Sequence, residues 1–293
     1  SRLAGIEVVI NAVGILRESR RQSFSALHIR APRALFTACA QAGVRKVIQI
    51  SALGADAKAV SRYHVSKANA DRHLMDLPLA WIVLRPSLVF GAGGASTRLF
   101  CSLATLPVIP LLGNGDQRVQ PVHIDDLAEL CVRLVSSEAC DRQVIDVVGP
   151  AVYSMRELLL ALRAMLGCGR PRFVGLPRAF VRVVASLAAW WPGALLERET
   201  LGMLERGNTA SAERFEQALG RMPRPAIPFA DAQRWRAPLL AWARLPWMSL
   251  VMRGSLAIVW LVTGLVSLGI YPVEQSLALL ARTGLTGATA KFA

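Results

Sequence analysis

The chain has 293 residues, 53% of them hydrophobic, so it can bury a sizeable core in one large domain or two smaller ones. It carries 34 lysines and arginines against 20 aspartates and glutamates, a formal net charge of +14. No zinc-finger spacing, basic helix or aromatic-and-basic strand pair accompanies that charge, so we expect no nucleic-acid partner. The five cysteines form no CxxC pair, which argues against a disulfide framework or a metal site and favours a reducing compartment.

Strands and helices are expected to alternate from the first residues to about residue 166. Short β-branched runs predict strands, and apolar residues at helical spacing predict helices. The expected strands are 6–12, 46–51, 78–86, 119–124 and 144–149, and the expected helices are 25–42, 63–74, 125–134 with Asp125 as N-cap, and 154–166 with a capping box at Ser154 and Glu157. Residues 91–116 read as loops around a short helix. The alternation predicts an α/β fold with a doubly wound parallel sheet.

The pattern changes after Gly167, and the rest of the chain is expected to be all α-helical. An apolar stretch at 180–196 is followed by a polar region and a proline-broken linker. Residues 254–273 are 20 residues without a charge, the length that a transmembrane helix needs, and 276–285 begins another apolar helix. Arginines precede the span, so the positive-inside rule places the N-terminal part in the cytoplasm, at the inner membrane. The alternative is a buried helix of a soluble core.

One motif indicates catalysis. Tyr63 and Lys67 lie four residues apart on a predicted helix that follows a strand ending in Ser51. An ammonium beside a tyrosine favours the phenolate and is expected to move the pKa of Tyr63 towards the working pH. A nearby serine hydroxyl can hold a substrate oxygen. Hydride transfer between a nicotinamide and a carbonyl needs such a proton donor, so we expect Tyr63, Lys67 and Ser51 to be catalytic.

Several motifs around these residues resemble, in order, the extended or atypical short-chain dehydrogenase/reductase family. The branch concerned resembles the nucleotide-binding accessory subunit of respiratory complex I. The matching segments are Asn11-Ala12-Val13-Gly14, Ile50 to Ala55, Tyr63 with Lys67, Arg85 to Gly91, and Val122 to Ala128. The resemblance implies a Rossmann-type fold and NAD or NADP as cofactor. It implies cofactor binding by Asn11, Ala12, Val13, Gly14, Lys67, Pro86, Ser87, Leu88 and Val89.

The C-terminal residues 245–287 resemble a DoxX-like membrane module, through segments such as Val259-Trp260-Leu261 and Tyr271-Pro272. We therefore expect an NAD(P)-binding domain at 1–166, a helical substrate-lobe remainder and linker at 167–244, and an incomplete DoxX-like segment at 245–293. The family's glycine-rich phosphate loop would precede residue 1, so the chain is interpreted as N-terminally truncated. The glycine cluster at 91–94 is interpreted as a loop.

Three functions compete at this stage. The first is a membrane-tethered NAD(P)-dependent oxidoreductase or epimerase acting on a small-molecule carbonyl or hydroxyl, with lipid contacts through the C-terminal helix. The second is a non-catalytic NAD(P)-binding assembly or sensor protein, and the third is a transport or redox role of the apolar module. His28 stands where relatives often carry an asparagine, which puts a proton relay in doubt. The four histidines are interpreted as surface or helix-lining residues, and Ser66 and Asn69 as solvated.

Overall fold

The computed structural model describes residues 3–19, 21–91, 93–138, 140–181, 207–227, 232–267 and 273–282. The chain divides into two compact units, Ser1–Ala243 and Arg244–Ala293. The elements of the first unit are β1 (Val8–Asn11), η1 (Ser25–Arg30), α1 (Ala31–Gln41), β2 (Lys46–Ile50), α2 (Arg62–Met75), β3 (Ala80–Pro86), β4 (Val89–Phe90), α3 (Ala95–Ala104), β5 (Val108–Leu112), β6 (Arg118–Val119), β7 (Val122–His123), α4 (Ile124–Ser136), β8 (Gln143–Val147), β9 (Tyr153–Ser154), α5 (Met155–Leu166), β10 (Arg172–Leu176) and α8 (Glu213–Leu219). Helix α9 (Ala232–Leu265) crosses the boundary between the units, and α10 (Val273–Arg282) follows it.

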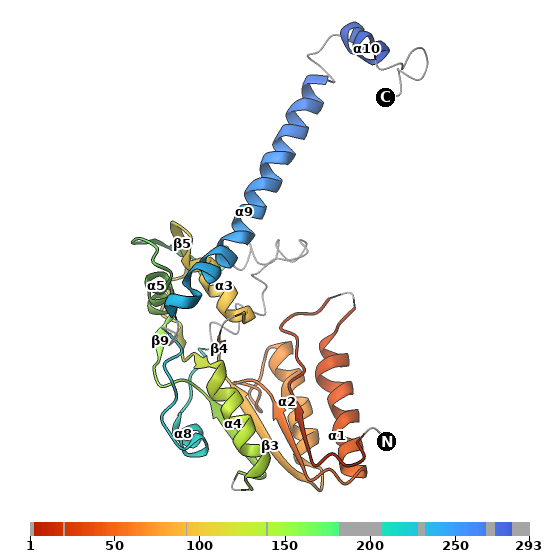
Figure 1. Ribbon diagram of the computed structural model, residues 1–293, viewed down its shortest axis with the longest axis vertical. Helices are drawn as coiled ribbons and strands as arrows, with labels where there is room; N and C mark the ends of the chain where they lie inside the picture. Colours follow the sequence, from red (N-terminus) through yellow and green to blue (C-terminus); the bar gives the residue numbers. More distant parts are fainter. Residues whose placement is uncertain are drawn as a thin grey trace. The chain divides into compact units, whose positions relative to one another are not determined.

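The centre of the first unit is a four-stranded parallel sheet in the order β1-β2-β3-β8 (Figure 1). Alternate residues of each strand point to opposite faces, so one sheet supplies two cores. Val47 and Val83 pack against α1 and α2 on one face, whereas Ile48 and Ile82 pack against α4 and α8 on the other. The predicted Rossmann-type sheet is confirmed, and the carboxyl ends of its strands meet at one edge.

A second core lies between α3, α5, the two-stranded sheet of β5 and β10, and the start of α9. The capping box is confirmed: the Ser154 hydroxyl accepts from the Glu157 backbone N–H, and α5 begins directly after it. The expectation of loops with one short helix at 91–116 is wrong in part, because β5 forms there. Its register with β10 is set by tertiary pairing, which the local pattern does not show.

The predicted strand 119–124 is replaced by two short strands, β6 and β7, which belong to different small sheets. Helix α4 also begins one residue earlier than expected. His123, not Asp125, is its N-cap, and the His123 Nδ1 accepts from the Asp125 backbone N–H at 3.2 Å. Asp125 therefore sits in the first helical turn, where its carboxylate complements the positive end of the helix dipole.

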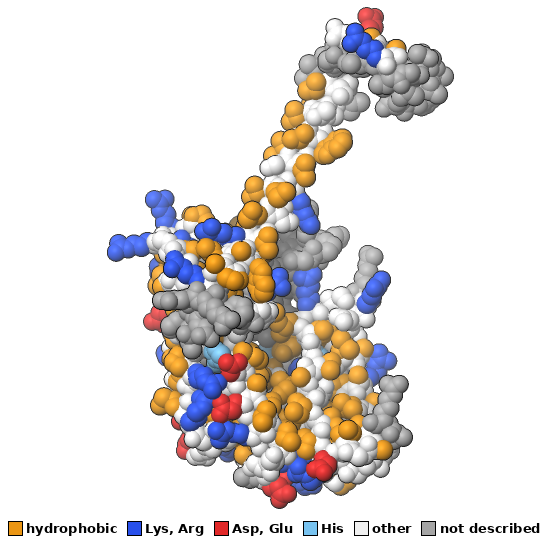
Figure 2. Space-filling view, in the orientation of Figure 1, with side chains coloured by type: hydrophobic (Ala, Val, Ile, Leu, Met, Phe, Trp, Pro, Cys, Tyr) orange, Lys and Arg blue, Asp and Glu red, His pale blue; other side chains and the backbone are white. Residues whose placement is uncertain are grey.

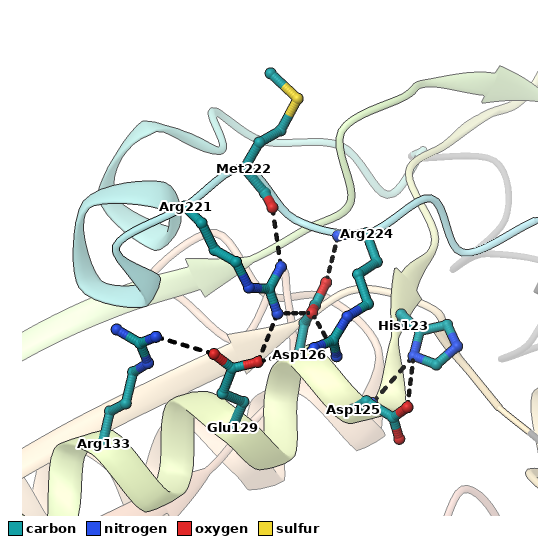
Figure 3. Close-up of polar contacts among 8 residues, drawn as sticks. All are labelled: His123, Asp125, Asp126, Glu129, Arg133, Arg221, Met222 and Arg224. Carbon is teal, nitrogen blue, oxygen red and sulfur yellow. Dashed lines mark hydrogen bonds and ion pairs between the residues drawn. The ribbon is translucent and has the colours of Figure 1, made fainter. Parts of the chain in front are cut away.

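Two carboxylates on α4 hold the segment that follows α8 (Figure 3). Asp126 is fully buried and accepts from Arg221 Nη2 at 2.5 Å and from the Arg224 backbone N–H at 2.6 Å. Glu129 Oε2 lies 2.6 Å from Arg221 and 3.1 Å from Arg224. Hydrogen bonds between charged groups are stronger than neutral ones, so this cluster fixes residues 207–227 on the sheet.

The predicted start of the span at residue 254 is wrong, and residues 268–272 near its predicted end lie outside the described residues. Helix α9 begins at Ala232 and ends at Leu265, and Val273 belongs to α10, whereas Tyr271 and Pro272 lie outside the described residues. Residues 236–265 form a single helix that, by length and composition, is long enough and apolar enough to cross a membrane. The first turns of this helix contribute Leu239 and Ala243 to the second core, whereas most of its large apolar side chains from Leu245 onward are exposed, Trp260 at 76%. Hydrophobic side chains accordingly line the surface of this helix (Figure 2). The alternative of a buried core helix is not what the structure shows.

Candidate active site

The candidate site lies at the edge of the parallel sheet where β1, β2 and β3 end. Asn11, the last residue of β1, is buried, and its Nδ2 donates to Gln49 Oε1 of β2 at 2.7 Å. The Asn11 side-chain oxygen accepts from the Val13 backbone N–H at 3.3 Å. Ala12, Val13 and Gly14 are exposed in the loop that follows. The structure thus brings the predicted cofactor-binding segment 11–14 to the sheet edge as one ordered turn.

Lys67 is buried beside this loop, because α2 packs across the ends of the first two strands. Its Nζ donates to the Val13 carbonyl at 3.1 Å and to the Ile50 carbonyl at 3.0 Å. A Cβ at position 14 would come within 3.0 Å of that Nζ, which is a physical reason for Gly14. Burial lowers the pKa of Lys67 to about 8, and the charge of Asp71 opposes this shift.

Tyr63 lies one helical turn before Lys67, and its ring packs between aromatic neighbours. Its centroid is 6.0 Å from that of Phe24 and 5.5 Å from that of His28. Burial, followed by the charge of Asp71, raises the pKa of Tyr63 to about 12. The expectation that the pKa of Tyr63 moves down towards the working pH is therefore wrong, because burial disfavours the charged phenolate. At neutral pH the Tyr63 hydroxyl keeps its proton and can donate it.

Ser51 directly follows β2, and its backbone N–H donates to the Leu84 carbonyl of β3 at 2.7 Å. Its hydroxyl donates to Asp71 Oδ2 at 2.6 Å. Sequence reasoning missed Asp71, although a signal existed: it lies four residues after Lys67, on the same face of α2. The structure therefore brings Tyr63, Lys67 and Ser51 to one edge of the sheet, together with a carboxylate that nothing had predicted.

The predicted segment Pro86-Ser87-Leu88-Val89 is only partly at this edge. The Pro86 carbonyl accepts from the Leu53 N–H at 2.9 Å, so it lies beside the loop after Ser51. The buried Ser87 hydroxyl donates to a backbone carbonyl of residue 120. Leu88 packs against the α3/α5 core and Val89 against the sheet core. Cofactor contacts by these four residues stay a prediction.

His28 is 1% exposed and lies in the π-helical turn η1, so of the two expected placements the surface one is wrong, and the side chain is buried within a helical turn. Its Nε2 accepts from the Ile15 N–H at 2.9 Å, and its Nδ1 lies 2.8 Å from the Ser66 Oγ. The Ser66 hydroxyl in turn donates to the Tyr63 carbonyl at 2.7 Å, so the Nδ1 of His28 carries the hydrogen. Ser66 is likewise buried and not solvated. This series of hydrogen bonds, through His28 and Ser66, links the loop after β1 to α2.

Acid should destabilise the protein through His28. Burial and the charge of Lys67 lower the pKa of His28 to about 4, against 6.5 in an unfolded chain, and Glu18 opposes the shift. Below pH 6.5 the unfolded state binds a proton that the folded state does not bind. The free energy of unfolding therefore falls between pH 6.5 and about 4, by up to about 3 kcal/mol. Urea titrations at several pH values should show this loss in the wild type and a flatter dependence in His28→Gln.

The control for that experiment is His73→Gln. His73 is half-buried, and its Nε2 lies 3.0 Å from the Thr37 hydroxyl. Its variant should keep the wild-type pH dependence. Other shifted groups, such as Asp71, are present in both variants and therefore cancel in the comparison. An unchanged pH dependence in His28→Gln would contradict the buried neutral imidazole.

Comparison with known families gives two matches, one at each end of the chain. Residues 1–137 match the NAD(P)H-binding family, and residues 257–293 match the DoxX-like family. The chain joins an NAD(P)-binding domain to a DoxX-like segment. The NAD(P)-binding domain contains Tyr63, Lys67, Ser51 and the loop after β1, so the whole candidate site falls within the matched range.

Curated relatives match a little under two thirds of this chain. The chain is 27% identical over 187 residues to NADH dehydrogenase [ubiquinone] 1 alpha subcomplex subunit 9 of Arabidopsis thaliana, covering 63% of this chain and 46% of the relative. It is 26% identical over 192 residues to a ceramide reductase of Caulobacter vibrioides, covering 65% of this chain and 60% of the relative. The chain thus spans about half the length of the curated relatives it matches.

Solved structures share the fold. A nucleoside-diphosphate-sugar epimerase from Staphylococcus aureus superposes with a TM-score of 0.61 at 17% identity, covering 82% of this chain and 78% of its own. A UDP-glucuronic acid 4-epimerase from Bacillus cereus, in complex with UDP-glucuronic acid and NAD, has a TM-score of 0.58 at 18% identity, covering 83% and 77%. Identities this low show the Rossmann-type fold of the NAD(P)-binding domain alone.

Proposed function

We propose that the chain is part of a membrane-tethered NAD(P)-dependent oxidoreductase or epimerase that acts on a carbonyl or hydroxyl group. One observation supports this most strongly: the buried Lys67 ammonium is held by two backbone carbonyls, from the loop after β1 and the end of β2. The same helix face places the protonated Tyr63 one turn away, and Ser51 follows the second strand.

The residues around Lys67 fit the ribose and nicotinamide end of a dinucleotide. Two N–H groups of Lys67 point at carbonyls, and an ammonium has three donors, so one is available for a ribose hydroxyl. Gly14 leaves the loop backbone open beside it. When bound there, the nicotinamide supplies or accepts the hydride.

In the proposed reaction, Tyr63 gives its phenolic proton to the substrate oxygen during reduction and takes it back during oxidation. Lys67 binds the ribose and stabilises the phenolate that this transfer leaves on Tyr63. Ser51 orients the reacting oxygen. The aromatic neighbours Phe24 and His28 keep the ring in place and exclude water from the phenol.

The membrane part bears on the substrate. The DoxX-like match and the apolar helix within 236–265 indicate membrane association. We infer that α9 tethers the NAD(P)-binding domain to the bilayer, with that domain on the cytoplasmic side. A relative is named ceramide reductase, which favours a lipid carbonyl or its alcohol as the substrate class.

A second candidate is a non-catalytic dinucleotide-binding subunit. Relatives named as subunits of NADH dehydrogenase favour it, as does the high pKa of Tyr63. The two candidates differ in turnover, not in nucleotide binding. A search for NAD(P)H oxidation with long-chain ketones in detergent, including the 3-oxo form of a ceramide, distinguishes them.

Nucleotide binding itself tests both candidates. We expect Lys67→Ala to weaken NADH or NADPH binding about tenfold or more, because it removes a charged hydrogen-bond donor to the ribose. The measurement is a fluorescence titration of each nucleotide against the protein in mild detergent. Lys58→Ala, at an exposed lysine in the loop between β2 and α2, is the matched control and should bind as the wild type does. Wild-type affinity in Lys67→Ala, or no binding of either nucleotide to the wild type, would sink the proposal.

A further inference from the structure

Asp71 is a buried carboxylate that no step above uses. It lies on α2, is 1% exposed, and faces the end of β2. Its Oδ2 accepts from the Ser51 hydroxyl at 2.6 Å, and the Nε of Arg85 on β3 lies 3.8 Å from the same oxygen. Among the described residues, Asp71 Oδ1 and Arg85 Nε are both buried without a hydrogen-bond partner. Burying a carboxylate is costly, so a group held in this way at a reaction site needs an explanation.

The contact decides what the Ser51 oxygen can do. A serine hydroxyl has one hydrogen to donate and two lone pairs that accept. While Ser51 donates to the Asp71 carboxylate, it can only accept a hydrogen bond from a substrate, as an alcohol would offer. If Asp71 holds a proton, it can donate to Ser51 Oγ, and the serine hydrogen is then available for a carbonyl oxygen.

We propose that Asp71 is a positioning residue that sets the direction of the Ser51 hydroxyl, and through it the preference of the site for an alcohol or a carbonyl. Ionised Asp71 makes Ser51 an acceptor that suits an alcohol to be oxidised. Protonated Asp71 makes Ser51 a donor that suits a carbonyl to be reduced. The inference rests on the proposed function, because it concerns the substrate of that same site.

The surroundings of Asp71 allow both states near neutral pH. Burial raises the pKa of Asp71 to about 6, against the hydrogen bond from Ser51, the charges of Arg85 and Lys67, and the Gln49 amide, which lower it. Tyr63 on the same helix is neutral, and Arg85 is shared with Asp146, its partner across β3 and β8. Burial therefore outweighs the positive charges of Arg85 and Lys67, and Asp71 can hold or release a proton near pH 6.

The first arm of the test needs no substrate. Infrared difference spectra of the protein in detergent, recorded across pH 4 to 8, should contain the C=O stretch of a protonated carboxyl that titrates near pH 6 and disappears in Asp71→Asn. In Ser51→Ala the midpoint should rise, because the hydrogen bond that favours the carboxylate is gone. Asp76→Asn, an exposed carboxylate at the end of the same helix, is the control and should leave the band unchanged. A band that Asp71→Asn retains, or a midpoint that Ser51→Ala does not move, overturns the inference.

The second arm uses turnover of a ketone and its alcohol. In the wild type, inhibition constants from turnover should show that the ketone binds its dead-end complex with the oxidised nucleotide more weakly as pH rises through about 6. The alcohol should bind its dead-end complex with the reduced nucleotide more tightly over the same range. The asparagine of Asp71→Asn can donate an amide hydrogen to Ser51. This variant should therefore favour the ketone at all pH values, without the change near pH 6. If Asp71→Asn still shows the change near pH 6, the inference is contradicted. Absence of any turnover contradicts the proposed function instead, and the infrared arm still decides the role of Asp71.

Discussion

Replacing Tyr63 by phenylalanine is expected to lower kcat/KM about 10²- to 10⁴-fold, the usual contribution of a positioned general acid or base. Phenylalanine keeps the ring contacts with Phe24 and His28, so neither folding nor the α2 packing should change. Only the proton is lost. Because Lys67 and the loop after β1 remain, nucleotide affinity should stay within about twofold of wild type. The measurement is a rate assay beside a nucleotide titration on the same preparation.

Tyr153→Phe provides the matched control for that substitution. Tyr153 lies in β9 and packs against the α3/α5 core, in a different core from that of Tyr63. Its variant should turn over substrate at the wild-type rate. If Tyr63→Phe turns over as fast as Tyr153→Phe, Tyr63 is not the proton donor of the reaction. Absence of turnover in the wild type would favour the non-catalytic candidate.

Replacing Lys46 by alanine should lower the free energy of unfolding by about 2–4 kcal/mol. Lys46, the first residue of β2, is fully buried; its Nζ lies 2.6 Å from Asp141 Oδ1 and donates to the carbonyls of Leu134 and Ser137. Removing one partner of a buried ion pair typically costs about 3–5 kcal/mol, and Asp141 is partly exposed, so we expect somewhat less. The substitution also removes the cation that stabilises the backbone carbonyls at the end of α4.

Urea titration followed by circular dichroism of the detergent-solubilised protein measures this effect. Lys46→Met keeps the volume of the stem and should lose less stability than Lys46→Ala, which also leaves a cavity. The exposed Lys58→Ala should lie within about 0.5 kcal/mol of the wild type. A Lys46→Ala variant as stable as Lys58→Ala would show that the buried ion pair contributes nothing to the fold.

Local patterns predicted much of the site because its chemistry is carried by short spacings. Tyr63 and Lys67 are one helical turn apart, and Ser51 ends a strand, so the helix period and the strand boundary place them at one edge. The same reasoning could have found Asp71, one further turn along. It could not find the contact of His28 with Ser66, because those residues are 38 apart and meet only when η1 packs on α2.

The pKa of Tyr63 shows why spacing alone misled. A neighbouring ammonium and a buried, partly anionic environment shift a phenol in opposite directions, and only the folded protein shows which is larger. The helix α9 shows the same limit, since neither its start at Ala232 nor its end at Leu265 follows from where the uncharged run begins and stops. Charged residues do not by themselves end a helix, so the limits of an uncharged run need not be the limits of the helix.

By itself, the sequence determined the alternation of strands and helices, the Tyr63–Lys67 pair and the apolar C-terminal segment, because each depends on residues close together in the chain. The tertiary structure decided what distance in sequence conceals: the pairing of β5 with β10, the burial of Lys46 and His28, and the hydrogen bond from Ser51 to Asp71. Desolvation and long-range pairing arise only when segments pack together. They therefore set the protonation states of the site, which no local pattern of residues encodes.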